Sequence, residues 1–266
     1  MTRQLADKVL RQVPGWQYAT LKELPGGMTN RSWLVEKDGE RAVLKIDDKV
    51  RDLPHGSRLE EAAVQTQAAA SGLANAVLYA DEVTLMTEYV AGTVLDPAAL
   101  GKDDNIERVA GALQRVHSLP LSGRTFDAMV AAQRYASRIE SHDVLLAAHC
   151  TKLIESVRRP LNLCCCHNDL VAANIIATPD IMFLDWEYAC DNDPLFDLAT
   201  VVEHHDLSGE LVSRLLDTYF AGNGERWREK LAEQQLLYRA LYWLWLAARP
   251  DTDADELETA ASRILP

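Results

Sequence analysis

The alternation of hydrophobic and polar positions in the first 90 residues is typical of short strands. YATLKELPGG (18–27) predicts a strand that ends at a glycine pair, and SWLVEKDGERAVLKI (32–46) predicts two strands joined at Asp38-Gly39. SRLEEAAVQTQAAASG (57–72) predicts a helix that stops at Gly72, and AVLYADEVTLMTEYV (76–90) predicts two more strands. The expected order is therefore three strands, one helix and two strands.

After Gly92 the spacing of hydrophobic positions changes to that of helices. NIERVAGALQRVHSLP (105–120) is the first such segment, and helical patterns continue from there except for a short cluster of strands around 162–185. The change predicts an α+β chain of two lobes. A small antiparallel-sheet lobe over 1–90 would bind a nucleotide, and a larger helical lobe over 91–266 would carry the catalytic and acceptor-binding residues.

Composition narrows the classes of partner. The chain has 266 residues and a net charge of −13, from 27 basic and 40 acidic side chains, which argues against nucleic acid and anionic membranes as main partners. No apolar run approaches the roughly 20 residues that span a bilayer. The N-terminal MTRQLADKVLRQVPGW lacks the apolar stretch of a signal peptide, and five cysteines are an odd number. We therefore expect reduced thiols and a cytoplasmic protein.

The stretch LCCCHNDLVAANII (163–176) draws attention to its three adjacent cysteines. In a strand, Cys164 and Cys166 point to one face and Cys165 to the other, so the three cannot jointly chelate one metal ion. No second CxxC or HxxxH completes a set. We interpret the cysteines as small buried hydrophobic residues in a core strand, and we expect a structural role for His117 at the end of its helix.

The polar residues after this strand indicate chemistry. His167, Asp169 and Asn174 form HxDxxxxN, in which the aspartate can act as a base. Downstream, IMFLDWEYA places Asp185 at the end of another apolar strand. Carboxylate and amide oxygens suit Mg²⁺ with substrate phosphates in its other positions. The alternative is a set of polar loop residues that cap a hairpin.

This pair of motifs resembles the catalytic machinery of protein-kinase-like enzymes. On that template Lys45, on the third strand, would bind phosphates, and Glu60 or Glu61 on the next helix would pair with it; we prefer Glu61. Further nucleotide contacts would come from the loop between the first two strands and from the backbone after the fifth. These candidates are Gly26, Gly27, Thr29, Asn30, Glu88 and Val90.

The chain resembles the choline/ethanolamine kinase family in three segments, LPGGMTNRSWLV, CHNDLVAANII and DWEYACDNDPLFDLA. This family is a branch of the kinase-like phosphotransferases that also contain aminoglycoside phosphotransferases. Bacterial thiamine kinases share the DWEYA block, and the likeness spans roughly 20–250. The resemblance implies that Asp169, helped by His167, is the catalytic base for transfer of the γ-phosphate of ATP. It implies that Asn174 and Asp185 hold Mg²⁺, and that Glu187 contacts a metal-bound water or fixes the loop.

A choline-type acceptor needs aromatic faces and carboxylates around its ammonium group. Tyr188 follows the DxE motif, and Tyr238, Tyr242 and Trp245 share one face of the last long helical segment. Glu203 or Asp206 would add negative charge. From these we expect Tyr188, Glu203, Tyr242 and Trp245 to bind the acceptor, although an aromatic stripe of this kind also occurs in helix cores.

The sequence thus predicts an ATP- and Mg²⁺-dependent kinase that phosphorylates the primary hydroxyl of choline or ethanolamine. A thiamine kinase is the alternative, and an aminoglycoside-type phosphotransferase or an inactive kinase-like binding protein comes after it. The inactive form is disfavoured because Lys45, Asp169, Asn174 and Asp185 are all present. The acceptor and the oligomeric state stay open at this stage.

Overall fold

The structure is a computed structural model that describes residues 3–24, 31–47, 56–102, 104–139, 143–158, 160 and 162–264, with only the backbone of Arg31. Contacts divide the chain into two compact units. The first contains Met1–Thr93 with Ile176–Ala189, and the second contains Val94–Ile175 with Cys190–Pro266. This division differs from the expected boundary at 90 in one segment. Residues 176–189, expected in the helical lobe, join the first unit, where Phe183 donates a backbone hydrogen bond to Leu73.

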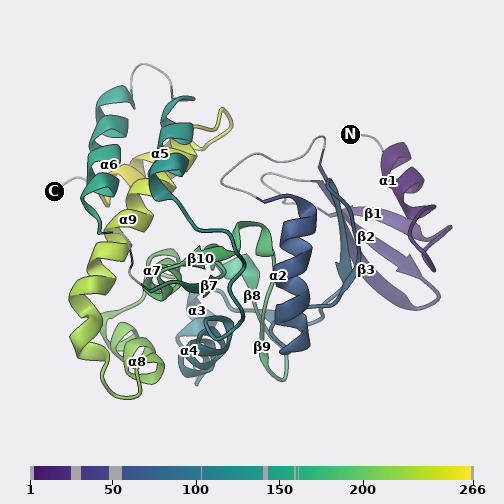
Figure 1. Ribbon diagram of the computed structural model, residues 1–266, viewed down its shortest axis with the longest axis horizontal. Helices are drawn as coiled ribbons and strands as arrows, with labels where there is room; N and C mark the ends of the chain where they lie inside the picture. The colour runs from purple at the N-terminus through teal and green to yellow at the C-terminus, as the bar shows by residue number, and fades with distance from the viewer. Residues whose placement is uncertain are drawn as a thin grey trace. The chain divides into compact units, whose positions relative to one another are not determined.

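The first unit is built on a five-stranded antiparallel sheet of order β1-β2-β3-β5-β4 (Figure 1). Its strands are β1 (Thr20–Leu24), β2 (Arg31–Lys37), β3 (Glu40–Ile46), β4 (Val77–Ala80) and β5 (Thr84–Glu88), and its helices are α1 (Arg3–Leu10) and α2 (Arg58–Ala70). The β2–β3 turn places Asp38 at φ 51° and Gly39 at φ 87°, as a tight hairpin requires. The predicted strand and helix order is confirmed for the described residues.

Alternation along β3 directs Ala42, Leu44 and Ile46 into the core of the first unit. Apolar residues of α1, including Ala6 and Leu10, belong to the same core. The opposite residues of this strand are less buried, and Lys45 is among them. The alternation that fills the core therefore also places Lys45 outside it.

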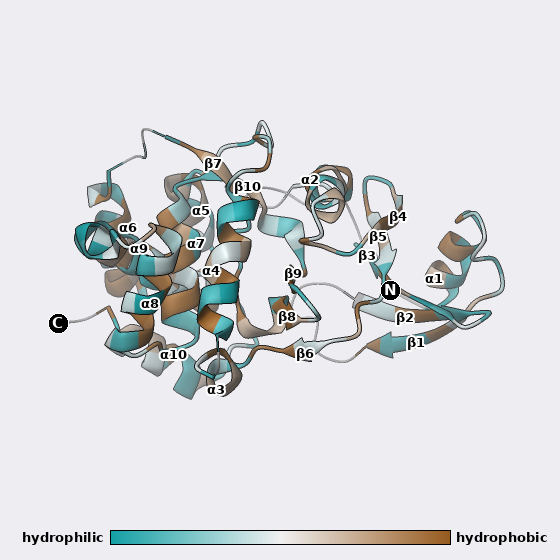
Figure 2. Cartoon of the chain, turned by 90° about the horizontal axis from the view of Figure 1, so that it is seen from below, coloured by the Kyte–Doolittle hydropathy of each residue, from teal (hydrophilic) through white to brown (hydrophobic). Residues whose placement is uncertain are grey.

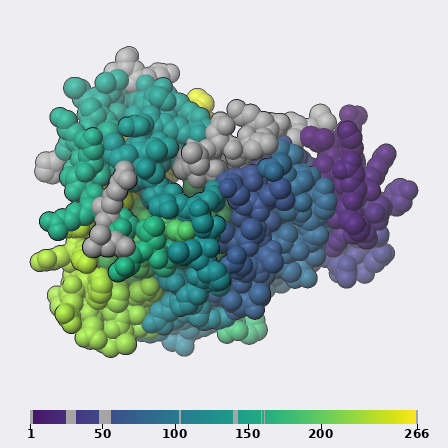
Figure 3. Space-filling view, in the orientation of Figure 1, coloured from purple at the N-terminus to yellow at the C-terminus, as the bar shows by residue number. Residues whose placement is uncertain are grey.

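Helix α2 starts and stops where its sequence predicts. Ser57 and Glu60 form a capping box, in which each side chain bonds the backbone N–H of the other residue. The helix ends at Ala70, and Gly72 follows its C-cap with a φ of 68°, which suits glycine. Part of the exposed side of α2 belongs to the surface turned toward the viewer in Figure 3. The cap occupies Glu60, so the buried Glu61 is the residue that faces the interior.

The second unit consists mainly of helices. They are α3 (Pro97–Leu100), α4 (Asn105–Val116), α5 (Ala128–Ala136), α6 (Val144–Ser156), α7 (Pro194–His204), α8 (Gly209–Tyr219), α9 (Arg228–Ala247) and α10 (Ala254–Ser262). A core cluster joins α9 to α5 and α6, with Trp243 and Leu244 almost fully buried. Hydrophobic and hydrophilic residues alternate along α4 in Figure 2, as expected for a helix with one buried side.

The short strands of the predicted cluster are present. β7 (Cys164–Cys166) pairs antiparallel with β10 (Cys190–Asn192), and a second small sheet has the order β6 (Thr93–Val94), β8 (Ile175–Ala177), β9 (Ile181–Phe183). Within the described residues, 3₁₀ helices span Ala172–Asn174, Trp186–Tyr188 and Gly224–Trp227. Cys165 and Cys166 are buried, as the core-strand interpretation requires, and Cys164 is partly exposed. Among the described helices, none combines the length and the apolar character that crossing a membrane demands.

Candidate active site

Lys45 lies in an ion network of the first unit. Its Nζ is 2.7 Å from Oδ1 of Asp185 and 3.9 Å from Oε1 of Glu61. Burial lowers the pKa of Lys45, but the charges of Asp185 and Glu61 more than offset this, so the pKa is raised and the ammonium keeps its charge. Of the two glutamates considered from the sequence, Glu61 lies beside Lys45, whereas Glu60 belongs to the helix cap.

Arg58 is part of this network and was not anticipated from the sequence. Its side chain is fully buried and donates two hydrogen bonds to Asp47, at 2.8 and 2.9 Å, and one to Glu61 at 2.7 Å. Its Nη1 is also 3.8 Å from Oε2 of Glu187. The nearby carboxylates outweigh burial, which alone would lower the pKa of Arg58, and raise that pKa. The only available signal was the spacing of Arg58 and Glu61 by three residues on one helix.

Asp185 and Glu187 form an acidic pair in the same unit. Asp185 has φ 62° and ψ 69°, in the left-handed region that non-glycine residues rarely adopt, just before the 3₁₀ helix that carries Glu187 and the half-buried Tyr188. Burial and then the charge of Asp185 raise the pKa of Glu187 to about 7. Two neighbouring carboxylates in a buried setting fit a hard divalent cation, because its charge relieves their repulsion and they supply the oxygen ligands that Mg²⁺ prefers.

The HxDxxxxN loop of the second unit is held by hydrogen bonds among its own residues. Nδ2 of Asn174 donates to the backbone oxygen of Asp169 at 2.9 Å and to its Oδ2 at 3.0 Å. The imidazole of His167 is buried and accepts the backbone N–H of Asp169 at 3.3 Å. The hydrogen bond from Asn174 therefore fixes the orientation of the Asp169 carboxylate. The His167 side chain lies inside the loop and is not exposed to a substrate.

Asp197, at the first turn of α7, anchors the backbone of this loop. Its carboxylate accepts the N–H groups of His167 at 2.8 Å and of Asn168 at 2.7 Å, and Asn168 has φ 65°. His117 at the end of α4 contacts the same carboxylate, with Nε2 at 3.1 Å from Oδ2. Neither Asp197 nor this function of His117 was identified from the sequence, since the contacts join residues 80 positions apart. The predicted structural role of His117 agrees with this contact.

The predicted residues are divided between the units. Lys45, Glu61, Asp185 and Glu187 lie in the first unit, and Asp169 and Asn174 lie in the second. The nucleotide candidates Gly26, Gly27, Thr29 and Asn30 lie outside the described residues.

The backbone after β5 was expected to contact adenine. The Glu88 N–H donates to Ala76 at 2.9 Å, and the Glu88 carbonyl accepts from the Asn75 side chain at 2.5 Å. Its carboxylate is exposed, and Val90 is half-buried. Glu88 thus already has partners for both backbone groups within the first unit.

The aromatic stripe on α9 forms a stacked row. The Tyr238 and Tyr242 rings lie 5.8 Å apart and the Tyr242 and Trp245 rings 5.9 Å apart, with interplanar angles of 8° and 21°. The guanidinium of Arg249 lies 4.6 Å from the centre of the Trp245 ring, so that face already binds a cation. Burial and then the charge of Asp169 raise the pKa of Tyr238. The Tyr238 hydroxyl is therefore within electrostatic reach of Asp169.

A cavity of about 200 Å³ adjoins this row. Glu203 lies in its wall, but its carboxylate accepts two hydrogen bonds from Arg239, at 2.6 and 2.7 Å, and one from Gln235. The charge that the sequence analysis assigned to an acceptor is thus already compensated within the protein. The lining residues are Glu203, His204, Tyr238, Arg239, Tyr242, Glu256, Thr259, Ala260 and Arg263.

Comparison with known proteins agrees with these features. Residues 20–233 match the model of the phosphotransferase enzyme family APH. Protein LicA of Haemophilus influenzae is 33% identical over 205 residues, covering 72% of this chain and 76% of that protein. Another Haemophilus influenzae LicA is also 33% identical, and the aligned part of this chain spans 61% of its length. A thiamine kinase of Shigella boydii is 26% identical over 204 residues, covering 74% of this chain and 71% of that protein.

Solved structures show the same fold. The crystal structure of choline kinase LicA from Streptococcus pneumoniae matches with a TM-score of 0.82 at 20% identity, over 98% of this chain and 97% of that one. A choline/ethanolamine kinase family protein from Mesorhizobium loti matches with a TM-score of 0.75 at 23% identity, over 99% of this chain and 94% of that one. The predicted kinase-like α+β fold is confirmed. The chain belongs to the phosphotransferase enzyme family, and it is similar to LicA proteins and to thiamine kinases.

Proposed function

We propose that the protein transfers the γ-phosphate of ATP to the primary hydroxyl of a small cationic alcohol, choline or ethanolamine. The observation that carries this proposal is the Asp169 carboxylate, held by Asn174 in the HxDxxxxN loop. A base fixed in this way can accept a hydroxyl proton. Relatives named LicA, one of them a choline kinase of known structure, support the class of acceptor.

The chemical step follows from the residues of the two units. Asp169 accepts the proton as the acceptor oxygen forms a bond to the γ-phosphorus, and the bond from that phosphorus to the bridging oxygen breaks to release ADP. Lys45 keeps its charge and binds the α- and β-phosphates, exchanging part of its contact with Asp185 for them. When bound, Mg²⁺ neutralises phosphate charge. Asn174, Asp185 and Glu187 would hold it, with Glu61 and Arg58 positioning Lys45 and Glu187.

For the acceptor we propose a site along the aromatic row of α9, which begins at Tyr238, the tyrosine whose pKa is raised by burial and by the charge of Asp169. Tyr242 extends the row, and Trp245 at its end keeps the Arg249 guanidinium over its ring. A cationic acceptor gains about 0.5–2 kcal/mol for each aromatic face it contacts. Glu203 would act indirectly, by holding Arg239 away from the cation.

Thiamine is the second candidate acceptor, because a thiamine kinase is among the relatives and a stacked aromatic row suits a flat cationic ring. An aminoglycoside is less suited to this row, because it needs many carboxylates. Measurement of ADP formed from ATP with choline, ethanolamine, thiamine and an aminoglycoside separates these possibilities. Phosphorylation of an aminoglycoside in preference to the small cations would contradict the proposal.

The catalytic assignment is tested by Asp169→Asn, which keeps the size of the side chain and removes its basicity. We expect kcat to fall by about 10²- to 10⁴-fold, the usual range for loss of a general base. Asp180→Asn is the matched control, because Asp180 is exposed at a turn between β8 and β9 and should leave kcat unchanged. Turnover of Asp169→Asn close to that of the wild type would show that Asp169 is not the base.

A further inference from the structure

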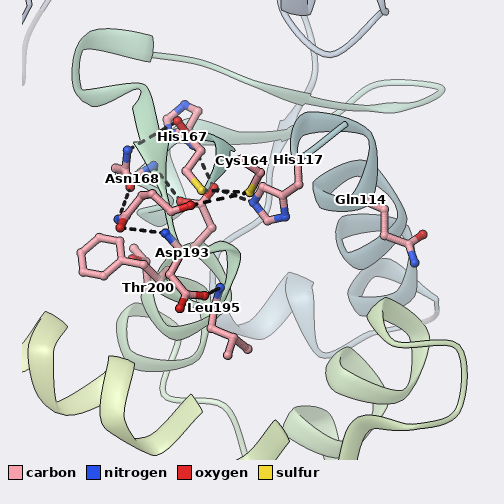
Figure 4. A network of polar contacts seen from close by, with 12 residues as sticks. Gln114, His117, Cys164, His167, Asn168, Asp193, Leu195 and Thr200 are labelled. Atoms are coloured by element: carbon pink, nitrogen blue, oxygen red, sulfur yellow. Dashed lines mark hydrogen bonds and ion pairs between the residues drawn. The ribbon is translucent and has the colours of Figure 1, made fainter. Parts of the chain in front are cut away.

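Two thiols and an imidazole come together behind the catalytic loop of the second unit. Ligand atoms of His117, Cys164 and Cys166 all lie within 4.8 Å of one another. The two sulfur atoms are 3.6 Å apart, and Figure 4 shows His117 at the end of α4 beside Cys164. These are soft and borderline ligands, unlike the oxygen donors proposed for Mg²⁺.

The geometry of the two thiols suits a tetrahedral metal ion. With Zn–S bonds of about 2.3 Å, two sulfur atoms of a tetrahedral site lie about 3.8 Å apart. The observed 3.6 Å is close to that value without any movement of the strand. The alternation of β7 brings this about, because Cys164 and Cys166 share a face while Cys165 points to the other side. Strand geometry excludes three adjacent cysteines on one metal ion, and the third ligand here is His117 at the end of α4.

His117 has the arrangement of a metal-binding histidine with its outer partner in place. Nδ1 is 2.6 Å from the Tyr219 hydroxyl, and Nε2 is 3.1 Å from Oδ2 of Asp197. Because Nε2 is held by Asp197, Nδ1 is the ring nitrogen that a metal ion can take, in exchange for its contact with the Tyr219 hydroxyl. Histidines that bind metals usually donate their second N–H to a carboxylate, which fixes the tautomer. Asp197 already occupies that position.

We propose that His117, Cys164 and Cys166 bind one thiophilic dication of the Zn²⁺ type, through Nδ1 and two thiolates. Both thiols release their protons to solvent, and the Tyr219 hydroxyl gives up its bond to Nδ1. A water molecule is the fourth ligand of the tetrahedral ion. The ion reaches the site from solvent at Cys164, which is partly exposed. Burial raises the pKa of Cys166, so the thiol does not ionise by itself and the metal ion must displace its proton.

Metal binding at this cluster is connected to the catalytic loop through Asp197. The same carboxylate that receives Nε2 of His117 also accepts the N–H groups of His167 and Asn168. A shift of His117 toward the two sulfur atoms therefore changes the contact that holds the backbone next to Asp169. We expect a metal ion bound to His117, Cys164 and Cys166 to lower turnover several-fold, so that a thiophilic metal inhibits the enzyme without contacting Asp169.

Binding is measured with Co²⁺, whose visible absorption becomes intense in a tetrahedral site and whose thiolate ligands add a charge-transfer absorption in the near ultraviolet. The purified full chain, reduced and metal-free, should develop this absorption with one Co²⁺ per chain and lose it when Zn²⁺ is added. Cys164→Ala and Cys166→Ala should each abolish it. Cys165→Ala is the matched control, because this residue is the neighbour on the opposite face of the strand, and it should keep the full signal.

The absence of thiolate absorption in the folded wild type would overturn the proposal, and so would a signal that survives in Cys164→Ala and Cys166→Ala. The measurement needs neither ATP nor an acceptor, so its result is independent of the proposed kinase activity. A second measurement follows turnover at saturating Mg²⁺ with added Zn²⁺. Inhibition of the wild type and of Cys165→Ala, but not of Cys164→Ala, supports the connection through Asp197. Equal inhibition of all three contradicts it.

Discussion

Replacing Arg58 with methionine tests whether the buried ion network stabilises the first unit. The guanidinium is fully buried, makes three hydrogen bonds of 2.7–2.9 Å to Asp47 and Glu61, and lies 3.8 Å from Glu187. Methionine keeps most of the apolar stem but removes the guanidinium that Asp47 and Glu61 bind directly, so that Lys45 is left as a cation beside Glu61 and Glu187. Removing one partner of a buried ion pair costs about 3–5 kcal/mol, because the remaining charge stays desolvated.

We therefore expect Arg58→Met to lower the free energy of unfolding by about 3–5 kcal/mol. With a urea dependence of about 3 kcal/mol/M for a chain of this size, the midpoint of unfolding falls by about 1 M or more. Circular dichroism and tryptophan fluorescence in urea, followed in parallel, give the midpoint. Arg58→Lys should recover part of the loss, since it restores the charge without the two-pronged contact to Asp47.

Arg214→Met is the matched control for this experiment. Arg214 also makes a two-pronged contact to a carboxylate, with Nε and Nη2 at 2.7 and 2.9 Å from Glu107. Both side chains are about one-third exposed, so the pair should contribute less than about 1 kcal/mol. A loss in Arg58→Met no larger than that in Arg214→Met would refute the reasoning that burial decides the value of these contacts.

Two further predictions concern stability in the second unit. Gly224→Ala should lower the free energy of unfolding by about 1–3 kcal/mol, because its Cβ would lie 2.7 Å from backbone atoms of Leu216 and Asp217. Gly111→Ala, inside α4 with open space around it, should raise the free energy of unfolding by about 0.5–1 kcal/mol. Thermal unfolding measures both variants, and equal effects would contradict the packing argument. Burial and then the charge of His205 lower the pKa of His204 to about 4, so between pH 6.5 and 4 the unfolded chain binds a proton at His204 more readily than the folded chain does. The stability of the wild type should therefore fall with decreasing pH more steeply than that of His204→Asn. Parallel curves of stability against pH for the two proteins would refute this.

Local pattern was sufficient for the elements of the first unit. The turn at Asp38-Gly39, the stop at Gly72 and the alternation along β3 depend on neighbours in the chain, and the structure agrees with each. Position on a strand also placed Lys45 outside the core. Motif spacing was enough to identify the phosphotransferase family, because HxDxxxxN and the later DxE lie within short segments.

The expected acceptor residues show where local pattern reaches its limit. Helical spacing correctly placed Tyr238, Tyr242 and Trp245 on one face, and they form a stacked row. Spacing could not show that Arg249 covers Trp245 or that Arg239 neutralises Glu203. Whether an aromatic or acidic side chain remains available to a ligand depends on partners that no periodicity encodes.

The sequence by itself thus determined the order of elements in the first unit and the family, and it supplied Asp169, Asn174 and Asp185 as the proposed site residues, because each of these depends on short segments. Only the tertiary structure decided that Arg58 joins three carboxylates and that His117 meets both Asp197 and the thiols of β7. The physical reason is that burial and charge compensation depend on which residues packing brings together. A buried charge needs its partner within a few ångströms, wherever along the chain that partner lies.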